Sequence, residues 1–435
     1  MLAALPQLVP GLPAAGQKAR AGVPVGSADA LALAQLAAVC AGEKRLLAVV
    51  AADALTAQRL ADELPWFAPG LSVALLPDWE TLPYDHFSPH QDLVSQRLAT
   101  LHHVSRGECA VLVVAATTAL YRLAPQEYLA AFTFFLKQGT RLDVDALRAQ
   151  LALAGYRHVT QVVSPGEFSV RGGLIDLFPM GSPLPYRLDL FDDDIESIKT
   201  FDADTQRTLY PVPNVRLLPA REFPLDEAGR ARFRMRFREA FEGDPSRSPL
   251  YKDVSNGVVP GGIEYYLPLF FDQTATLADY LPRDAVVAFV GDVAGAVERF
   301  WQDTDSRYKL LRGDKSRPLL PPTSVFLPPD AFHGAIKGHA RIEIPAADAE
   351  SAPDIEARGT VALPRVEVDR RAQDPLTALK RYLASGAARV LICAESAGRR
   401  ETMQQYFAEY GQDVPLADDW RSIVASQAAC ALVVS

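Results

Sequence analysis

Apolar positions in the first part of the chain follow two different patterns. The runs Arg45–Ala51 and Ala110–Ala115 are almost continuously apolar, which is typical of strands buried on both faces. Between such runs, Leu31–Ala41, Ala54–Leu64 and Gln91–Val104 repeat their apolar residues at helical spacing. Buried strands that alternate with helices form a parallel sheet covered on both faces. We therefore predict an α/β domain of RecA or Rossmann type at the start of the chain.

A different pattern begins near Phe132. A short predicted helix, Val144–Ala154, is followed by runs such as Leu174–Phe178 and Tyr186–Phe191, which glycines and prolines separate. This punctuation indicates short strands joined by tight turns. We expect a small α+β module here.

Helix and strand patterns of the first kind return afterwards, and the chain ends in the apolar run Ala429–Val434. Because a domain rarely stops inside a core strand, we expect the chain to be part of a longer protein. The predicted organisation is α/β and multidomain. Its four segments are residues 1–131 (α/β), 132–216 (the small α+β module), 217–354 (a third segment) and 355–435 (a separate small α/β domain).

Composition narrows the class of protein. The 435 residues carry a net charge of −9, which argues against a chain that mainly binds nucleic acid. Four scattered cysteines form no disulfide or zinc pattern, and a basic secretory leader is lacking, so we expect a cytoplasmic protein. His86 and His90 stand four residues apart, but Pro89 between them makes a shared helix unlikely to form, so we predict no metal site.

The strand Tyr186–Phe191 places unusual residues together. Period-two alternation sets Arg187, Asp189 and Phe191 on one face, opposite the apolar side chains. A large aromatic residue on a polar face beside an arginine is typical of a protein-binding hot spot, and Arg171 stands in the same set of strands. The alternative is that Phe191 covers a neighbouring loop while the arginines pair with the acidic residues 192–194. The pattern alone leaves both interpretations open.

A phosphate-binding loop would open the first helix of such a domain. Gly26, Ser27 and Ala28 occupy this place, but the GK[ST] sequence that contacts phosphates and magnesium is missing. The pair Gly26-Ser27 suffices to cap the helix and no more. We therefore predict no ATP hydrolysis in this segment. A working nucleotide-binding enzyme remains the alternative, and it would have to bind ATP here.

A second alternative function is direct DNA binding. Arg230, Arg234 and Arg238 fall along one side of a predicted helix, beside a stripe formed by Phe233, Phe237 and Phe241. A basic helix face could contact phosphates. The simpler interpretation is a core stripe flanked by arginine stems whose charged heads stay in water.

Four long runs carry a family resemblance: Asp78–Leu101 (DWETLPYDHFSPHQDLVSQRLATL), Gly155–Thr208, Gly261–Phe271 (GGIEYYLPLFF) and Arg317–Pro322. On these runs the chain resembles the transcription-repair coupling factors over nearly its whole length, and it covers the N-terminal part of that family. The first three segments also resemble the excision-repair protein UvrB. This resemblance implies that residues 132–216 are an inserted module and that residues 1–131 and 217–354 are the two parts of one UvrB-like domain. UvrB has an intact phosphate loop and a DNA-clamping hairpin, whereas this chain passes directly from Asp85 to the helix at Gln91.

The resemblance implies a partner and an interface. It implies that the inserted module recruits UvrA, the damage-recognition ATPase, and that Arg171, Arg187 and Phe191 match the interaction motif of the family. Each arginine can pair with a partner carboxylate, and Phe191 can fill an apolar pocket. No cofactor is expected in this segment.

The resemblance also concerns regions beyond this chain. It implies a motor that uses ATP and Mg²⁺ to translocate on duplex DNA, a module that binds RNA polymerase, and a C-terminal module that masks the UvrA-binding surface. The expected role of the present chain is therefore that of a non-catalytic adaptor.

Overall fold

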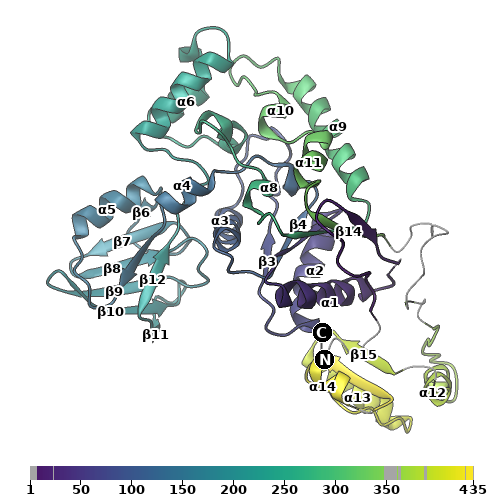
Figure 1. Cartoon of the computed structure of the whole chain (residues 1–435). Coiled ribbons are helices and arrows are strands. Elements are labelled where there is room, and N and C mark those ends of the chain that lie inside the picture. The colour runs from purple at the N-terminus through teal and green to yellow at the C-terminus, as the bar shows by residue number, and fades with distance from the viewer. Residues whose placement is uncertain are drawn as a thin grey trace.

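The fold is a central α/β body with a smaller module on one side and a small domain below it (Figure 1). The computed structural model describes residues 7–22, 24–346, 360, 364–386, 389–426 and 428–434. Within these ranges, none of the helices combines the length and the apolar composition needed to cross a membrane.

A six-stranded sheet, parallel throughout, forms the centre of the body. The strands LAVVA, VLVVA and VVAFV at its centre consist of apolar residues, because both of their faces are buried. In spatial order the strands are β1 (Lys18–Arg20), β14 (Ala340–Ile344), β13 (Val286–Val290), β2 (Leu47–Ala51), β4 (Val111–Ala115) and β3 (Val73–Leu76).

Helices cover both faces of this sheet. Alternate strand residues such as Leu47 and Val49 pack in one core with helices α1 (Ala28–Gly42) and α2 (Ala54–Phe67). The residues between them, such as Ala48, belong to a second core shared with α3 (Gln91–Ser105) and α9 (Val293–Leu311). The remaining helical segments of the body are η2 (Thr118–Leu120), α4 (Gln126–Ala131), α6 (Glu227–Ala240), η3 (Pro245–Arg247), α7 (Pro249–Ser255), η4 (Ile263–Leu269), α8 (Leu277–Tyr280), α10 (Pro322–Val325) and α11 (Pro329–Ile336).

The inserted module has a sheet of its own. Six strands lie in the order β11-β10-β9-β8-β7-β6, antiparallel except for the β6–β7 pair, and helix α5 (Val144–Leu153) belongs to the same module. The strands are β6 (Arg157–His158), β7 (Glu167–Arg171), β8 (Leu174–Phe178), β9 (Tyr186–Phe191), β10 (Asp194–Phe201) and β11 (Thr208–Pro211). The chain enters through β5 (Phe134–Lys137) and returns through β12 (Asn214–Leu217), which pair antiparallel.

The last domain contains a two-stranded parallel sheet of β15 (Val390–Ala394) and β16 (Cys430–Val434). Leu379, Phe407 and Leu432 form its small core. Its helices are α12 (Thr377–Ala384), α13 (Ala397–Glu409) and α14 (Trp420–Ala425).

The α/β fold class predicted from the sequence is confirmed, including the parallel sheet. The predicted strands Leu174–Phe178 and Tyr186–Phe191 coincide with β8 and β9. Strands β1 and β14 were not foreseen, although they form one side of the central sheet. The three boundaries between the four predicted segments stay a proposal, and the one at residues 354 and 355 lies outside the described residues.

Candidate protein-binding face

One face of the inserted sheet is apolar and the other is largely polar. Alternation along β9 buries Leu188 in the core on one side. Cross-strand register sets the polar residues of β7 to β10 together on the other side, because residues opposite each other in a ladder point to the same face. We call this side the open face. It is formed by Arg171, Asp176, Arg187, Asp189, Phe191, Ser197 and Lys199.

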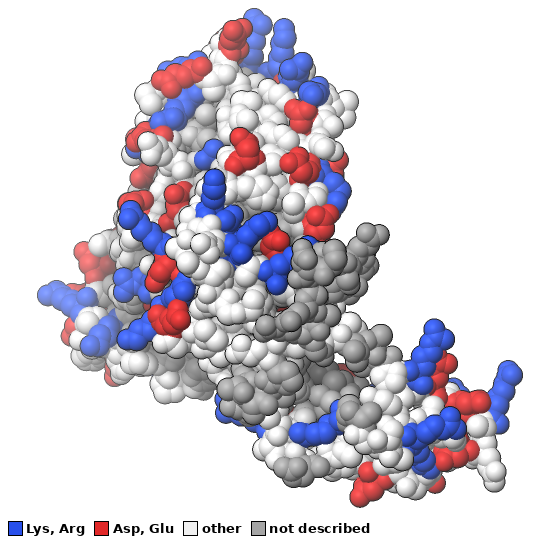
Figure 2. Space-filling model, turned by 45° about the vertical axis from the view of Figure 1, so that its right-hand side comes forward, with Lys and Arg blue, Asp and Glu red and all other residues white. Residues whose placement is uncertain are grey.

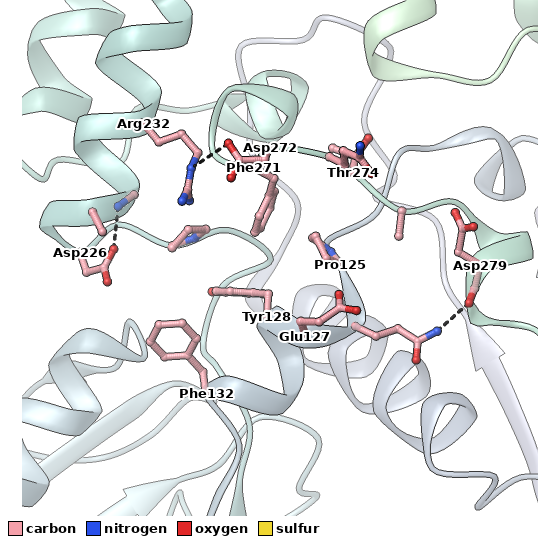
Figure 3. Close-up of a pocket in the computed structure, with 16 residues that line it drawn as sticks. Pro125, Glu127, Tyr128, Phe132, Asp226, Arg232, Phe271, Asp272, Thr274 and Asp279 are labelled. Carbon is pink, nitrogen blue, oxygen red and sulfur yellow. Dashed lines mark hydrogen bonds and ion pairs between the residues drawn. The ribbon is translucent and has the colours of Figure 1, made fainter.

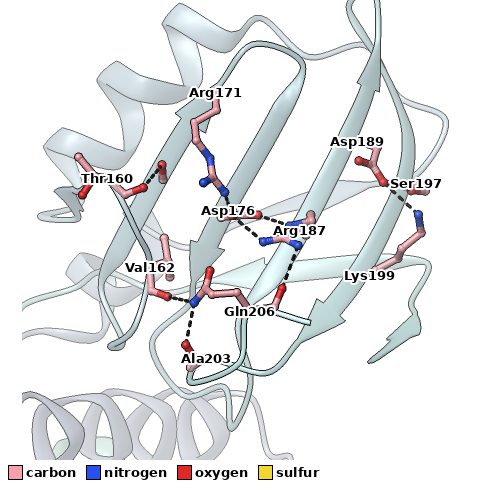
Figure 4. Close-up of polar contacts among 11 residues, drawn as sticks. Thr160, Val162, Arg171, Asp176, Arg187, Asp189, Ser197, Lys199, Ala203 and Gln206 are labelled. Atoms are coloured by element: carbon pink, nitrogen blue, oxygen red, sulfur yellow. Dashed lines mark hydrogen bonds and ion pairs between the residues drawn. The ribbon is translucent and has the colours of Figure 1, made fainter. Parts of the chain in front are cut away.

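A buried carboxylate joins the two arginines of the open face (Figure 4). Asp176 is 1% exposed, and its Oδ1 and Oδ2 accept hydrogen bonds from Arg187 Nε at 2.7 Å and Nη2 at 3.0 Å. Arg171 Nη2 donates to the same Oδ2 at 2.6 Å. Such charge-assisted bonds satisfy a carboxylate that would be costly to bury alone.

Arg187 makes further contacts within the module. Its Nη1 donates to the backbone oxygen of Gln206 at 3.2 Å, and its guanidinium lies 4.7 Å from the ring centroid of Phe201. The Arg187 side chain is therefore only 17% exposed, whereas that of Arg171 is 52% exposed. The two arginines predicted as equivalent partner contacts thus differ in how far solvent can reach them.

A second polar ladder lies beside the first. Asp189 Oδ2 accepts from Ser197 Oγ at 2.8 Å and from Lys199 Nζ at 3.0 Å (Figure 4). Partial burial alone would raise the pKa of Asp189, but the hydrogen bonds from Ser197 and Lys199 outweigh it, and the pKa is lowered. Asp189 therefore stays ionised at neutral pH. The open face consequently alternates basic and acidic groups across its strands.

Phe191 stands at the end of β9 with 68% of its surface exposed. The next residue, Asp192, has a φ of 52°, the left-handed conformation that a tight hairpin turn requires. The alternative that Phe191 covers a neighbouring loop is therefore wrong. Arg171 and Arg187 also do not pair with the acidic turn, since Asp193 accepts from Arg141 at 2.8 Å instead.

Sequence reasoning missed the residue that organises the open face. Asp176 lies in the apolar run LIDLF, where a charged residue between Ile175 and Leu177 is a signal that it has a fixed partner. Lys199 was also missed. Its place opposite Arg187 depends on the register of β9 and β10, which the sequence pattern does not give.

The degenerate phosphate loop lies in the body, far along the chain from the open face. Gly26 and Ser27 form a turn, and α1 begins at Ala28. The Ser27 carbonyl accepts the N–H of Leu31, but the side chain of Ser27 makes no cap hydrogen bond. Ser27 thus stands at the N-cap position, as expected, but it caps the helix without a side-chain hydrogen bond.

Acidic side chains surround the cavity in which a complete phosphate loop would hold a nucleotide. Gly26 and Ser27 line a cavity of about 450 Å³, together with Asp29, Asp53 and Asp292. Arg59 is the basic side chain in its lining, and it is bound to Asp29 through Nη1–Oδ1 at 3.0 Å and Nη2–Oδ2 at 2.5 Å. A carboxylate in the first turn of α1 thus sits where a helix amino terminus would otherwise attract phosphate.

Another cavity, of about 930 Å³, lies where the chain passes between the body and the inserted module (Figure 3). Tyr128, Phe132 and Phe271 are among its aromatic lining residues. Several of its charged groups have partners within the chain: Arg232 Nε lies 3.4 Å from an Asp272 oxygen, and Asp226 and Asp279 cap α6 and α8. The arrangement is that of a polar junction between two domains.

The arginines of α6 also have partners. Arg230 and Arg234 both pair with Glu227, at 2.7 and 3.0 Å, and Arg238 lies over the ring of Tyr251. Phe233 on the same helix is fully buried, as the core-stripe interpretation predicts. On the face of the molecule in Figure 2, basic and acidic side chains are mixed over the upper part of the body rather than segregated. Direct DNA binding gains no support from this arrangement.

Comparisons with known proteins identify the inserted module and the last domain. The family model of the UvrB interaction domain matches residues 134–223, and the model described as "MFD, D3 domain" matches residues 382–435. The transcription-repair-coupling factor of Haemophilus influenzae is 42% identical over 378 residues, which are 86% of this chain and 32% of the relative. That of Escherichia coli is 41% identical over 395 residues, which are 91% of this chain and 34% of the relative.

A parallel α/β body that carries a UvrB interaction domain defines a protein of UvrB-like architecture. The matches along most of the chain are more specific. The chain belongs to the transcription-repair coupling factor family, and it spans about a third of the length of the curated relatives it matches.

Proposed function

We propose that this chain recruits UvrA in transcription-coupled nucleotide excision repair and that it does so through the open face. One observation carries the proposal: the domain that matches the UvrB interaction domain holds the Phe191 ring and the Arg171 guanidinium exposed on one rigid sheet face. An exposed aromatic anchor beside an arginine is the composition of a binding hot spot. Arg171, Arg187 and Phe191 remain the proposed interface residues.

Calorimetric titration of the chain with UvrA tests this proposal. Phe191→Ala removes a large apolar contact and should weaken binding by at least about 2 kcal/mol, roughly thirtyfold. Phe135→Ala is a matched control, because Phe135 is 65% exposed on β5 in the same module but lies outside the open face. Equal losses for both variants, or a loss for neither, would place the interface elsewhere.

We further propose that the chain acts without catalysing a reaction of its own. Three carboxylates around the cavity at Gly26 would repel the phosphates of ATP, and the Asp29–Arg59 pair occupies the helix end that phosphates use elsewhere. A thermal-unfolding series with Mg-ATP should show no rise in Tm. A rise that grows with nucleotide concentration would contradict this part of the proposal.

The longer family members supply the wider context of the proposal. In them, ATP and Mg²⁺ would drive a DNA translocase that acts on stalled RNA polymerase in the cytoplasm, and a C-terminal module would mask the open face until polymerase is engaged. Masking predicts that this chain binds UvrA more tightly than a full-length relative does. Equal affinities would count against it.

A further inference from the structure

The two arginines of the open face are not equally free to contact a partner. Arg187 uses three of its N–H groups on Asp176 and Gln206 and stacks on Phe201. Arg171 uses one, so most of the five N–H donors of its guanidinium remain available. Arg171 is also the more exposed of the two.

Asp176 couples the two side chains. It lies opposite Arg187 in the β8–β9 ladder, and its Oδ2 accepts from both guanidinium groups. Arg187 binds this carboxylate through two parallel hydrogen bonds. These bonds fix the direction of Oδ2 and therefore the position of the Arg171 guanidinium. A buried carboxylate held in this way has little rotational freedom.

Arg171 and Phe191 lie toward the same end of the sheet. Arg171 is opposite Leu174, and Leu174 is opposite Asp189, which precedes Phe191 by two residues on β9. The hairpin turns that follow Arg171 and Phe191 lie at the same end of the sheet. A partner surface can therefore meet the free guanidinium and the aromatic ring together.

We propose that Arg171 and Phe191 contact UvrA directly, and that Asp176 and Arg187 are positioning residues that hold the Arg171 guanidinium in place. The partner site that fits is a carboxylate beside an apolar pocket. This inference rests on the proposed function, because it assigns separate roles within the same interface.

A double-mutant cycle separates positioning from contact. We expect Arg171→Ala to weaken UvrA binding about thirtyfold and Arg187→Ala about fivefold. Combined, they should weaken it about thirtyfold, because Arg187 acts only through Arg171. In a chain that already carries Phe191→Ala, Arg187→Ala should still weaken UvrA binding about fivefold, so that the two losses multiply. A general loosening of the module would give non-additive losses in both combinations, and it would overturn the inference.

Asp176→Asn gives a second test. Positioning of Arg171 by Asp176 and independent contacts by both arginines predict different changes in UvrA affinity. If Asp176 positions Arg171, the substitution should weaken binding about tenfold. If both arginines contact UvrA independently, releasing them from Asp176 should leave the affinity unchanged or raise it, and that result would overturn the inference. Arg157→Ala serves as the control for Arg187→Ala, because it likewise removes an arginine from a buried carboxylate, Glu167, in the same sheet. Its affinity should stay unchanged.

The outcomes distinguish this inference from the proposed function. Losses from Arg171→Ala and Arg187→Ala that multiply would show that both arginines touch the partner, which overturns the inference while the proposed function stands. Absence of binding by the unsubstituted chain would overturn both. Circular dichroism and Tm measurements on every variant confirm that the titrated protein is folded.

Discussion

Arg97 has a fully buried side chain at the heart of the body. Its Nε donates to Glu222 Oε1 at 2.6 Å, its Nη1 donates to the carbonyl of Pro77 at 2.8 Å, and its guanidinium lies 5.1 Å from the ring centroid of Trp79. Glu222 comes from the segment that returns from the inserted module. A single ion pair thus joins α3 to the junction between two domains.

Removal of Glu222 should destabilise the fold strongly, because the charge of Arg97 would stay buried without its partner. We expect Glu222→Ala to lower the free energy of unfolding by about 3–5 kcal/mol in denaturant titrations. Glu227→Ala is the control, since Glu227 pairs with two arginines but is 73% exposed, and its removal should destabilise the chain far less. Similar losses for the two variants would contradict this account.

The buried carboxyl group of Glu264 makes part of the stability of the fold depend on pH. Burial raises its pKa from about 4.5 to about 7, although Ser88 Oγ donates to its carboxylate at 2.9 Å. Between these two values the folded chain holds a proton that the unfolded chain has lost. The contribution of Glu264 to stability should therefore fall as pH rises from about 4.5 to about 7 and level off above that value.

Glu264→Gln removes this titration and keeps the shape of the side chain. The variant should match the unsubstituted chain near pH 4.5 and become more stable relative to it with rising pH, by about 3 kcal/mol at most above pH 7. Unfolding free energies of both proteins at several pH values measure the difference. A difference that does not change between pH 5 and 8 would refute the raised pKa.

At the scale of elements, the loop between β3 and α3 is held by contacts from distant parts of the chain. Tyr84 has a left-handed backbone with a φ of 64°, which is rare for a bulky residue, and its hydroxyl donates to the carbonyl of Leu320. Gly262 fits against this loop, since a Cβ there would lie 2.2 Å from the carbonyl oxygen of Asp85. The loop and η4 thus form one packed unit.

Gly262→Ala tests this close approach. Both the left-handed backbone, with a φ of +70°, and the clash with the loop oppose a side chain. Gly257→Ala is the control, because Gly257 has a φ of +80° but meets only the flexible end of Arg230. We expect about 1–2 kcal/mol of destabilisation for the control and at least about 2 kcal/mol more for Gly262→Ala. Equal losses would mean that the loop moves away freely.

These elements also show what the sequence could and could not predict. Strands such as β8 and β9 are bounded by glycines and prolines, and their local patterns sufficed to place them. The conformation of Tyr84 depends on residues far along the chain, and no local pattern encodes it. In the candidate site, alternation along one strand placed Phe191 on the polar face but left its exposure open, and the burial of Arg187 follows from Asp176 on the neighbouring strand.

At the scale of the whole molecule, an aromatic cluster joins the last domain to the body among the described residues. The Trp420 ring lies 5.4 Å from that of Trp66 and 5.1 Å from that of Phe67, both at the end of α2. Arg421 Nη2 adds a hydrogen bond to the carbonyl of Pro69 at 2.7 Å. The inserted module lies on another side of the body (Figure 1). The docking of the last domain and the open face are thus separate features.

Trp420→Ala should loosen the docking of the last domain, because this ring packs against Trp66 and Phe67 of the body. Small-angle scattering should then show a larger radius of gyration, and hydrogen exchange near Trp66 should become faster. Arg421→Ala removes only an exposed hydrogen bond and should change neither quantity much. UvrA affinity should stay the same in both variants, since the open face is untouched. A loss of affinity in Trp420→Ala alone would show that the last domain and the inserted module communicate through the body.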